Sequence, residues 1–314
     1  MSLLQPGDTV GFVATSSGLE GRDIAPAVNY FEQKLHLKVK LAPNLSYAYR
    51  YMAGTDAERG KCLTEMYRSP EVKALFAIRG AGGSSRMLNF LDYDIIARHS
   101  KPLFGLSDVT AVQNALVARA STPAYTGFLP IYDIKNDSLN SELETSLKNI
   151  LFAPVHCLKS GTSLYPGKAE GQIIGGCLTS FLYLAGTNYM PDLAGKILLI
   201  EDTDEKTYKL DLMFSQLKQL KNFDKLHGII IGAFSDCIVI DSFVYHHISD
   251  WHWLREGEQS SNQPRGTYEK RLYDSCPVWS FNLTAPGSNM PVDTYKYIDV
   301  LIKVLKYMSE DNVI

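Results

Sequence analysis

The sequence predicts an α/β protein in which helices cover both faces of a mostly parallel sheet. Short apolar runs alternate along the chain with longer segments whose apolar residues recur at helical spacing. Clusters of Gly, Pro, Ser and Thr separate the two kinds of segment, as turns do. Strands that alternate with helices are joined by right-handed crossovers, and such crossovers make the strands parallel.

The first half of the chain repeats this alternation. Residues 8–14 (DTVGFVA) are an apolar run that a Pro-Gly pair opens and a Thr-Ser-Ser run closes, which is typical of a buried strand. Residues 22–35 then carry apolar side chains at helical spacing. The same criteria predict strands at 38–41, 74–78, 103–106 and 123–126, and helices at 56–67, 85–91, 94–98 and 109–118.

A break near the middle of the chain predicts two domains. Residues 136–152 predict a helix with one polar face, and the segment after it is rich in Pro, Gly and Ser. We therefore expect an N-terminal domain at 1–152, a linker at 153–170 and a C-terminal domain at 171–314. In the second domain we expect strands at 171–174, 197–200 and 228–233, helices at 178–184, 210–220 and 295–307, and an irregular surface excursion at 246–268.

Composition excludes several classes of protein. The 314 residues are 45% hydrophobic and 21% charged, which describes a globular chain long enough for about two domains. The net charge of −3 argues against a nucleic-acid partner. No apolar run approaches the roughly 20 residues that span a bilayer, and the start of the chain lacks a signal-peptide pattern. Five scattered cysteines predict a reduced, cytoplasmic protein without a structural metal site.

Ser107 is the first candidate for chemistry. It lies in the segment 104–110 (FGLSDVT), where a strand turns sharply into a helix. A serine at such a turn exposes its hydroxyl, and the first N–H groups of the helix can stabilise an oxyanion. Val109 replaces the second glycine of the α/β-hydrolase turn. The alternative interpretation is that Ser107 only caps the helix.

Two further strand ends carry candidate groups. The glycine-rich segment 79–83 (RGAGG) lacks the spacing of a nucleotide-binding loop, so it predicts either a tight turn or backbone N–H donors facing Ser107. The apolar strand 196–202 ends in Glu201 and Asp202, either as a solvated strand end or with a carboxylate that orients a histidine. None of the histidines forms a metal-binding pattern with a carboxylate or a cysteine.

Together, these motifs make the chain resemble the LD-carboxypeptidase family, serine peptidases that include murein tetrapeptide carboxypeptidases and microcin C7 self-immunity proteins. The resemblance runs nearly from end to end, and the order and spacing of its parts are specific. The parts are residues 4–10 (LQPGDTV), 14–17 (ATSS), 52–59 (MAGTDAER), 79–83 (RGAGG), 91–94 (LDYD), 105–110 (GLSDVT), 174–178 (IGGCL), 185–187 (AGT) and 199–202 (LIED).

The resemblance implies a fold and an activity. The fold would be a flavodoxin- or glutamine-amidotransferase-like parallel sheet domain followed by a smaller swivelling β/α domain. Family members cleave the amide bond before a terminal amino acid in cytosolic peptidoglycan fragments, with a Ser–Glu–His triad and without a metal or other cofactor. The resemblance assigns the nucleophile to Ser107, the carboxylate to Glu201, and the oxyanion donors to the backbone at Asp108 and at Gly80, Ala81 and Gly82. It also implies a homodimer.

The family's histidine is missing from its expected position. Counting back from residues 290–293 (MPVD), the histidine position holds Leu283. The position before it, which is a glycine in the family, holds Asn282. Leucine cannot accept the serine proton, and members of a triad act as a unit. One alternative is therefore a hydrolase of muropeptides or related peptide conjugates that recruits His246, His247 or His252 as its base. The other is an inactive homologue that binds a peptidoglycan fragment or a peptidyl-nucleotide without cutting it.

Overall fold

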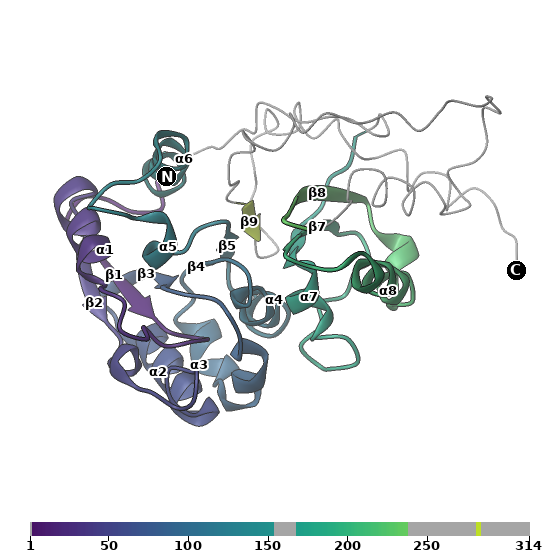
Figure 1. The fold of residues 1–314 in the computed structure, drawn as a ribbon, viewed down its shortest axis with the longest axis horizontal. Helices are drawn as coiled ribbons and strands as arrows, with labels where there is room; N and C mark the ends of the chain where they lie inside the picture. Colours follow the sequence, from purple (N-terminus) through teal and green to yellow (C-terminus); the bar gives the residue numbers. More distant parts are fainter. Residues whose placement is uncertain (1, 154–167, 238–280, 284–314) are drawn as a thin grey trace, which may run out of the picture.

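Figure 1 shows the computed structural model of the chain, which describes residues 2–153, 168–237 and 281–283. The described residues form two separate sheets, with the long helix α4 (Val109–Ala120) between them. The predicted α/β class is confirmed. The predictions for 246–268 and for a helix at 295–307 lie outside the described residues. None of the described helices combines the length and hydrophobicity that a membrane-spanning helix needs.

The larger sheet has five parallel strands and one antiparallel edge strand, in the order β2-β1-β3-β4-β5-β9. The antiparallel strand was not expected from the sequence, because residues 281–283 do not belong to the alternation of strands and helices that predicts the other strands. The strands are β1 (Thr9–Val13), β2 (Lys38–Leu41), β3 (Val72–Ala77), β4 (Leu103–Gly105), β5 (Ala124–Thr126) and β9 (Phe281–Leu283).

Helices cover both faces of this sheet, as expected. The predicted helix at 136–152 begins later, at Ser141, because the Asn140 side chain accepts hydrogen bonds from the N–H groups of Glu142 (2.9 Å) and Leu143 (3.4 Å) and so caps the helix there. The remaining elements of this half are α1 (Ala25–Asn29), η1 (Tyr30–Lys34), η2 (Pro43–Ser46), α2 (Asp56–Arg68), η3 (Ser84–Phe90), α3 (Tyr93–Arg98), α5 (Pro130–Asp133) and α6 (Ser141–Phe152).

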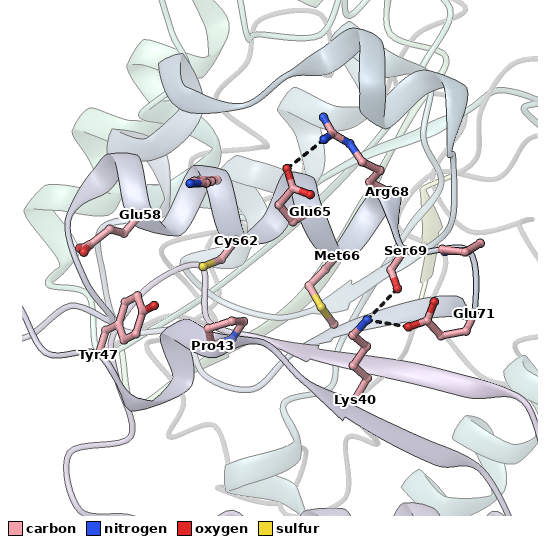
Figure 2. Close-up of a pocket in the computed structure, with 12 residues that line it drawn as sticks. Lys40, Pro43, Tyr47, Glu58, Cys62, Glu65, Met66, Arg68, Ser69 and Glu71 are labelled. Carbon is pink, nitrogen blue, oxygen red and sulfur yellow. Dashed lines mark hydrogen bonds and ion pairs between the residues drawn. The ribbon is translucent and has the colours of Figure 1, made fainter.

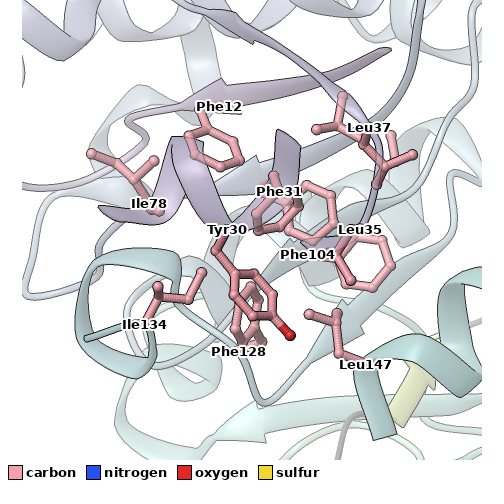
Figure 3. Close-up of a cluster of buried hydrophobic side chains, with 14 of the residues drawn as sticks. Phe12, Tyr30, Phe31, Leu35, Leu37, Ile78, Phe104, Phe128, Ile134 and Leu147 are labelled. Atoms are coloured by element: carbon pink, nitrogen blue, oxygen red, sulfur yellow. The ribbon is translucent and has the colours of Figure 1, made fainter. Parts of the chain in front are cut away.

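Each face of the larger sheet has its own hydrophobic core. The core on the face covered by α1, α5 and α6 is rich in aromatic side chains, including Phe12, Phe31 and Phe104 (Figure 3). The Phe104 ring lies 4.4 Å from the Phe76 ring and 4.6 Å from the Tyr125 ring, centroid to centroid. This row of rings joins β3, β4 and β5 into a rigid layer, so the residues that follow these strands are held at one edge.

The smaller sheet is parallel throughout, in the order β6-β7-β8. Its strands are those that the sequence predicts, although each extends further along the chain than expected. Its elements are β6 (Ile173–Cys177), α7 (Leu178–Leu182), β7 (Ile197–Thr203), α8 (Thr207–Lys218), η4 (Phe223–Lys225) and β8 (Gly228–Ser235).

Helix α4 holds the two sheets together. The Asn114 side chain donates to the Gly175 carbonyl (2.8 Å) and accepts from the Gly175 N–H (2.9 Å). One turn earlier, Thr110 Oγ1 accepts from the Cys177 N–H (3.1 Å). Gly176 has a φ of +125°, and a Cβ at this residue would lie 2.7 Å from Thr110 Oγ1, so only glycine permits so close an approach. The carboxyl end of β6 therefore meets the first turn of α4.

Candidate active site

Ser107 lies at a sharp turn between β4 and α4 in a strained backbone conformation. Its φ is +62°, a left-handed value that a non-glycine residue adopts only when the surrounding structure enforces it. The N-cap of α4 is Asp108 rather than Ser107, and no side-chain cap bond forms there. The structure therefore does not support the interpretation of Ser107 as a simple helix cap. Strain of this kind is typical of functional serines at strand-to-helix turns.

The glycine-rich turn that follows β3 lies directly against Ser107. A Cβ on Gly80 would lie 3.2 Å from the Ser107 Cβ and 3.4 Å from its Oγ. A side chain at position 80 would therefore crowd the hydroxyl. The turn passes through a second left-handed residue, Ala81, whose φ is +84°. The predicted neighbourhood of Ser107 and Gly80 is thus present, and the backbone of the turn borders the hydroxyl.

The Asp108 side chain connects this turn to the loop after β1. Asp108 is only 3% exposed, and its carboxylate accepts from the Ser16 hydroxyl (2.6 Å) and the Ser84 N–H (2.8 Å). The Ser84 hydroxyl in turn donates to the Asp108 carbonyl. The residue after the candidate nucleophile therefore ties three strand ends together, a role that the sequence did not indicate.

Glu201 lies on β7 at an irregularity of the smaller sheet. Ile200 pairs with Ile231 and Asp202 pairs with Phe234, so Glu201 faces two residues of β8. Such a bulge changes the direction of a side chain and is common beside active sites. The Glu201 Oε1 atom is buried and has no hydrogen-bond partner among the described residues. Burial, with a smaller contribution from the negative charge of Asp202, raises the pKa of Glu201 to about 8.

Asp202 has a different environment from its neighbour. It is 4% exposed, and its carboxylate accepts from the N–H (2.9 Å) and the hydroxyl (2.8 Å) of Thr179 and from the Thr203 N–H (2.9 Å). These bonds hold the start of α7 against β7. The two carboxyls are therefore not a solvated strand end: Asp202 is a satisfied structural group, and Glu201 has a buried oxygen, Oε1, that accepts no hydrogen bond from the described residues.

A short series of contacts leads from Ser107 to Glu201. The Thr110 N–H donates to the Ser107 carbonyl (2.9 Å), and the Thr110 hydroxyl accepts from the Cys177 N–H. Cys177 is paired in register with Glu201 on the neighbouring strand. Tyr183, which is 57% exposed, follows α7, and partial burial together with the negative charges of Asp108 and Asp202 raises the pKa of its hydroxyl. The ends of both sheets thus supply groups to one region.

The backbone of Leu283, the residue at the family's histidine position, pairs at the opposite end of β5 from the candidate site. Leu283 lies in β9, where its backbone pairs with Ala124, the first residue of β5. Thr126, at the carboxyl end of β5, pairs with Phe281 instead. His246, His247 and His252 lie outside the described residues. In the described part of the chain, no three His, Cys, Asp or Glu side chains form a group that could hold a metal ion.

A cavity of about 770 Å³ lies elsewhere, between α2, η2 and β2 (Figure 2). Its lining includes two surface ion pairs: Lys40 Nζ lies 2.6 Å from Glu71, and Arg68 lies 3.3 Å from Glu65. Neither Ser107 nor Glu201 lines this cavity. We therefore place the candidate site at Ser107, where a left-handed serine meets the glycine-rich turn.

Comparisons with known proteins find matches over most of the chain. The model of the LD-carboxypeptidase N-terminal domain matches residues 10–127, and that of the C-terminal domain matches residues 170–258. A probable murein peptide carboxypeptidase of Bacillus subtilis is 34% identical over 241 residues, which cover 76% of this chain and 75% of that protein. The microcin C7 self-immunity protein MccF of Escherichia coli is 28% identical over 73% of this chain and 76% of its own length.

The fold is also found among solved structures. A muramoyltetrapeptide carboxypeptidase from Oxalobacter formigenes superimposes with a TM-score of 0.69 at 25% sequence identity. The superposition covers 79% of this chain and 84% of the other. The similarity therefore extends over most of the chain.

Proposed function

Because the chain belongs to the LD-carboxypeptidase family, we propose that it is a serine hydrolase that removes the terminal amino acid from muropeptides or related peptide conjugates. The observation that carries the proposal is the strained turn at Ser107, with Gly80 against its hydroxyl. A left-handed backbone at a serine that precedes a helix, with its hydroxyl against a backbone turn, is expected of a nucleophile, whereas a serine that caps the start of a helix has extended backbone angles.

The chemistry would follow the acyl-transfer pattern. Ser107 Oγ attacks the amide carbonyl, and a base takes its proton and passes it to the leaving amine. The backbone N–H groups of Asp108 and of residues 80–82 stabilise the oxyanion. Water then hydrolyses the acyl-enzyme and regenerates Ser107.

Glu201 would orient the base. A protonated imidazole beside it would lower its pKa from about 8, so that the carboxylate ionises as the base becomes charged. With leucine at position 283, the proposal assigns the base to His246, His247 or His252.

A second candidate function is binding without cleavage. Leu283 occupies the family's histidine position, and the Glu201 carboxyl lacks a cationic partner in the described part of the chain. A site with a nucleophile and an oxyanion turn but no base retains only about 10³–10⁴-fold catalysis over water. Such a protein would hold a peptidoglycan fragment or a peptidyl-nucleotide.

We further propose a cytoplasmic homodimer whose protomers each have two domains, at 1–152 and 171–314, joined by a linker at 153–170. These proposals rest on the family resemblance and on the composition of the linker. The free cysteines at positions 62, 177 and 237 agree with a reducing compartment.

Serine labelling tests the proposed function. A fluorophosphonate probe should label the wild-type protein and not Ser107→Ala, and the wild-type protein should release D-alanine from a peptidoglycan tetrapeptide. Ser121→Ala is the matched control, because Ser121 ends the same helix with a φ of +49° and is solvent-exposed. It should be labelled like the wild type.

Histidine variants separate the two candidate functions. In a hydrolase, one of His246→Ala, His247→Ala and His252→Ala should lower D-alanine release by roughly 10²–10⁴-fold, which is the contribution of general acid–base catalysis. A wild-type protein that binds the tetrapeptide but shows neither labelling nor release would establish the binding function instead.

A further inference from the structure

A fully buried arginine lies beneath the candidate site. Arg59 projects from α2 and is 0% exposed. Its Nη1 atom donates to the carbonyls of Thr15 and Gly83, at 2.7 Å each. Its Nη2 atom pairs with the Asp56 carboxylate and contacts Met52 Sδ at 3.3 Å. One guanidinium thus holds the loop after β1 and the end of the glycine-rich turn, which are far apart in the sequence.

The buried carboxylate of Asp108 holds the adjacent residues of the same two segments. It accepts from Ser16 and Ser84, each of which follows a residue whose carbonyl Arg59 binds. The Arg59 guanidinium therefore binds the carbonyls of Thr15 and Gly83. The Asp108 carboxylate binds the next residue of each segment, through the Ser16 hydroxyl and the Ser84 N–H. The opposite charges of the two groups stabilise each other: burial lowers the pKa of Arg59, and the charges of Asp56 and Asp108 oppose that change.

Ser107 and the glycine-rich turn are both anchored to this pair. Asp108 follows Ser107 directly, and Gly83 and Ser84 end the turn whose first glycine lies against the Ser107 hydroxyl. We propose that Arg59 and the Asp108 side chain are positioning residues that set the distance between the glycine-rich turn and Ser107 Oγ. The effect on catalysis rests on the proposed function, but the effect on backbone order does not.

The geometry requires a guanidinium. Arg59 Nη1 donates to both carbonyls and Nη2 pairs with Asp56, and the planar fork of arginine holds these two nitrogens in fixed positions. A lysine side chain is one bond shorter and carries its charge on a single nitrogen, so it cannot take the place of Nη1 between the two carbonyls while it pairs with Asp56. Arg59→Lys therefore keeps the charge but loses the connection between the two segments, whereas Arg59→Met loses both.

Hydrogen exchange measured by mass spectrometry tests the inference without reference to activity. In Arg59→Lys, amides of residues 80–84 should exchange roughly tenfold faster than in the wild type, as expected when one local hydrogen bond is lost. Arg68→Gln is the matched control, because Arg68 lies on the same helix, is exposed and pairs only with Glu65 among the described residues. It should exchange like the wild type. Unchanged exchange at 80–84 in Arg59→Lys would overturn the inference.

Kinetics test the catalytic consequence. With kcat expressed per serine titrated by the fluorophosphonate, Arg59→Lys should lower kcat by roughly 10–100-fold and leave KM within about threefold, because misplacement by about 1 Å has effects of this size. A purely structural role would reduce the number of titrated serines and leave kcat per site unchanged, which would overturn the positioning role. A wild-type protein that shows neither labelling nor turnover would refute the proposed function. In that case hydrogen exchange alone would test whether Arg59 positions the glycine-rich turn.

A milder pair of variants applies if Arg59→Lys does not fold. Ser84→Ala removes the bond from the Ser84 hydroxyl to the Asp108 carbonyl, and Ser16→Ala removes a donor to the Asp108 carboxylate. Each should increase exchange at 80–84 and lower kcat per site in the same sense as Arg59→Lys. Wild-type values for both variants would contradict the role of Asp108.

Discussion

At the scale of single residues, the candidate site depends on two groups held in unfavourable states. Ser107 has a left-handed backbone, and Glu201 has a buried carboxyl oxygen without a partner among the described residues. Each state destabilises the folded protein by an amount that surrounding packing must offset. The neighbouring carboxylate of Asp202 is also buried, but it accepts hydrogen bonds from Thr179. The lack of such bonds to Glu201 Oε1 therefore results from where Glu201 lies on the strand.

The titration of Glu201 predicts a specific dependence of stability on pH. Its folded-state pKa is raised from 4.5 to about 8, so the stability that its protonated form contributes is complete below pH 4.5 and is lost as pH rises through about 8. Glu201→Gln should lack this loss. We compare the free energy of unfolding of Glu201→Gln with that of the wild type at each pH. The difference should be more favourable to the variant at pH 8.5 than at pH 4.5, by on the order of 2–4 kcal/mol.

Urea unfolding at the two pH values measures this difference. Glu65→Gln provides the control, because Glu65 is an exposed carboxyl that pairs with Arg68 on the helix surface, and its pH dependence should follow the wild type. The same pH dependence in wild type and Glu201→Gln would show that Glu201 is ionised in the folded protein at neutral pH.

At the scale of elements, α4 carries out two tasks. Its first turn continues the chain from Ser107, and its middle holds β6 through the paired hydrogen bonds between Asn114 and Gly175. The same helix thus fixes the nucleophile and the sheet that carries Glu201. Helix α4 is buried on most of its surface, because it lies between the two sheets.

Asn114→Ala should therefore weaken the connection between the sheets. The substitution leaves a buried N–H and a buried carbonyl of Gly175 without their partner, and each such group costs about 1–3 kcal/mol. We expect a loss of roughly 2–4 kcal/mol in the free energy of unfolding. Asn29→Ala, at an exposed residue with one long 3.5 Å bond to Asp137, should change it by less than about 0.5 kcal/mol. Equal stability of the two variants would show that α4 holds β6 by packing alone.

At the scale of the whole molecule, both sheets contribute to the candidate site. Ser107 and the glycine-rich turn come from the larger sheet, and Glu201 and Tyr183 come from the smaller one. A ligand that contacts both parts binds the folded chain and not the unfolded chain. Binding must therefore raise the stability of the whole protein, whether or not cleavage follows.

A peptidoglycan tetrapeptide that ends in D-alanine should raise the melting temperature of Ser107→Ala. At a concentration about 100 times its Kd the gain is about 2.7 kcal/mol, which corresponds to several degrees for a protein of this size. Differential scanning calorimetry with the tetrapeptide, and with a tripeptide that lacks the terminal D-alanine, measures the shift and its dependence on that residue. No shift with either peptide at millimolar concentration would count against both proposed functions.

The sequence by itself determined the alternation of strands and helices and the turn at residue 107. Each of these features depends on residues close together in the chain: the apolar runs that become β1 and β3, and the Ser-Asp pair that joins a strand to an apolar helix. The family resemblance extended this local information to the candidate residues Ser107 and Glu201. Sequence patterns therefore located the candidate groups without describing their surroundings.

Only the tertiary structure decided the state of those groups. The unused buried oxygen of Glu201, the satisfied carboxylate of Asp202 and the bonds from Arg59 to Thr15 and Gly83 all depend on segments distant in the sequence. In the sequence, Arg59 is one of several charged residues of a predicted helix. Only the folded structure shows that its side chain is completely buried. Burial and hydrogen bonding are properties of the space between segments, and a local pattern of residues cannot encode which distant atoms will fill that space.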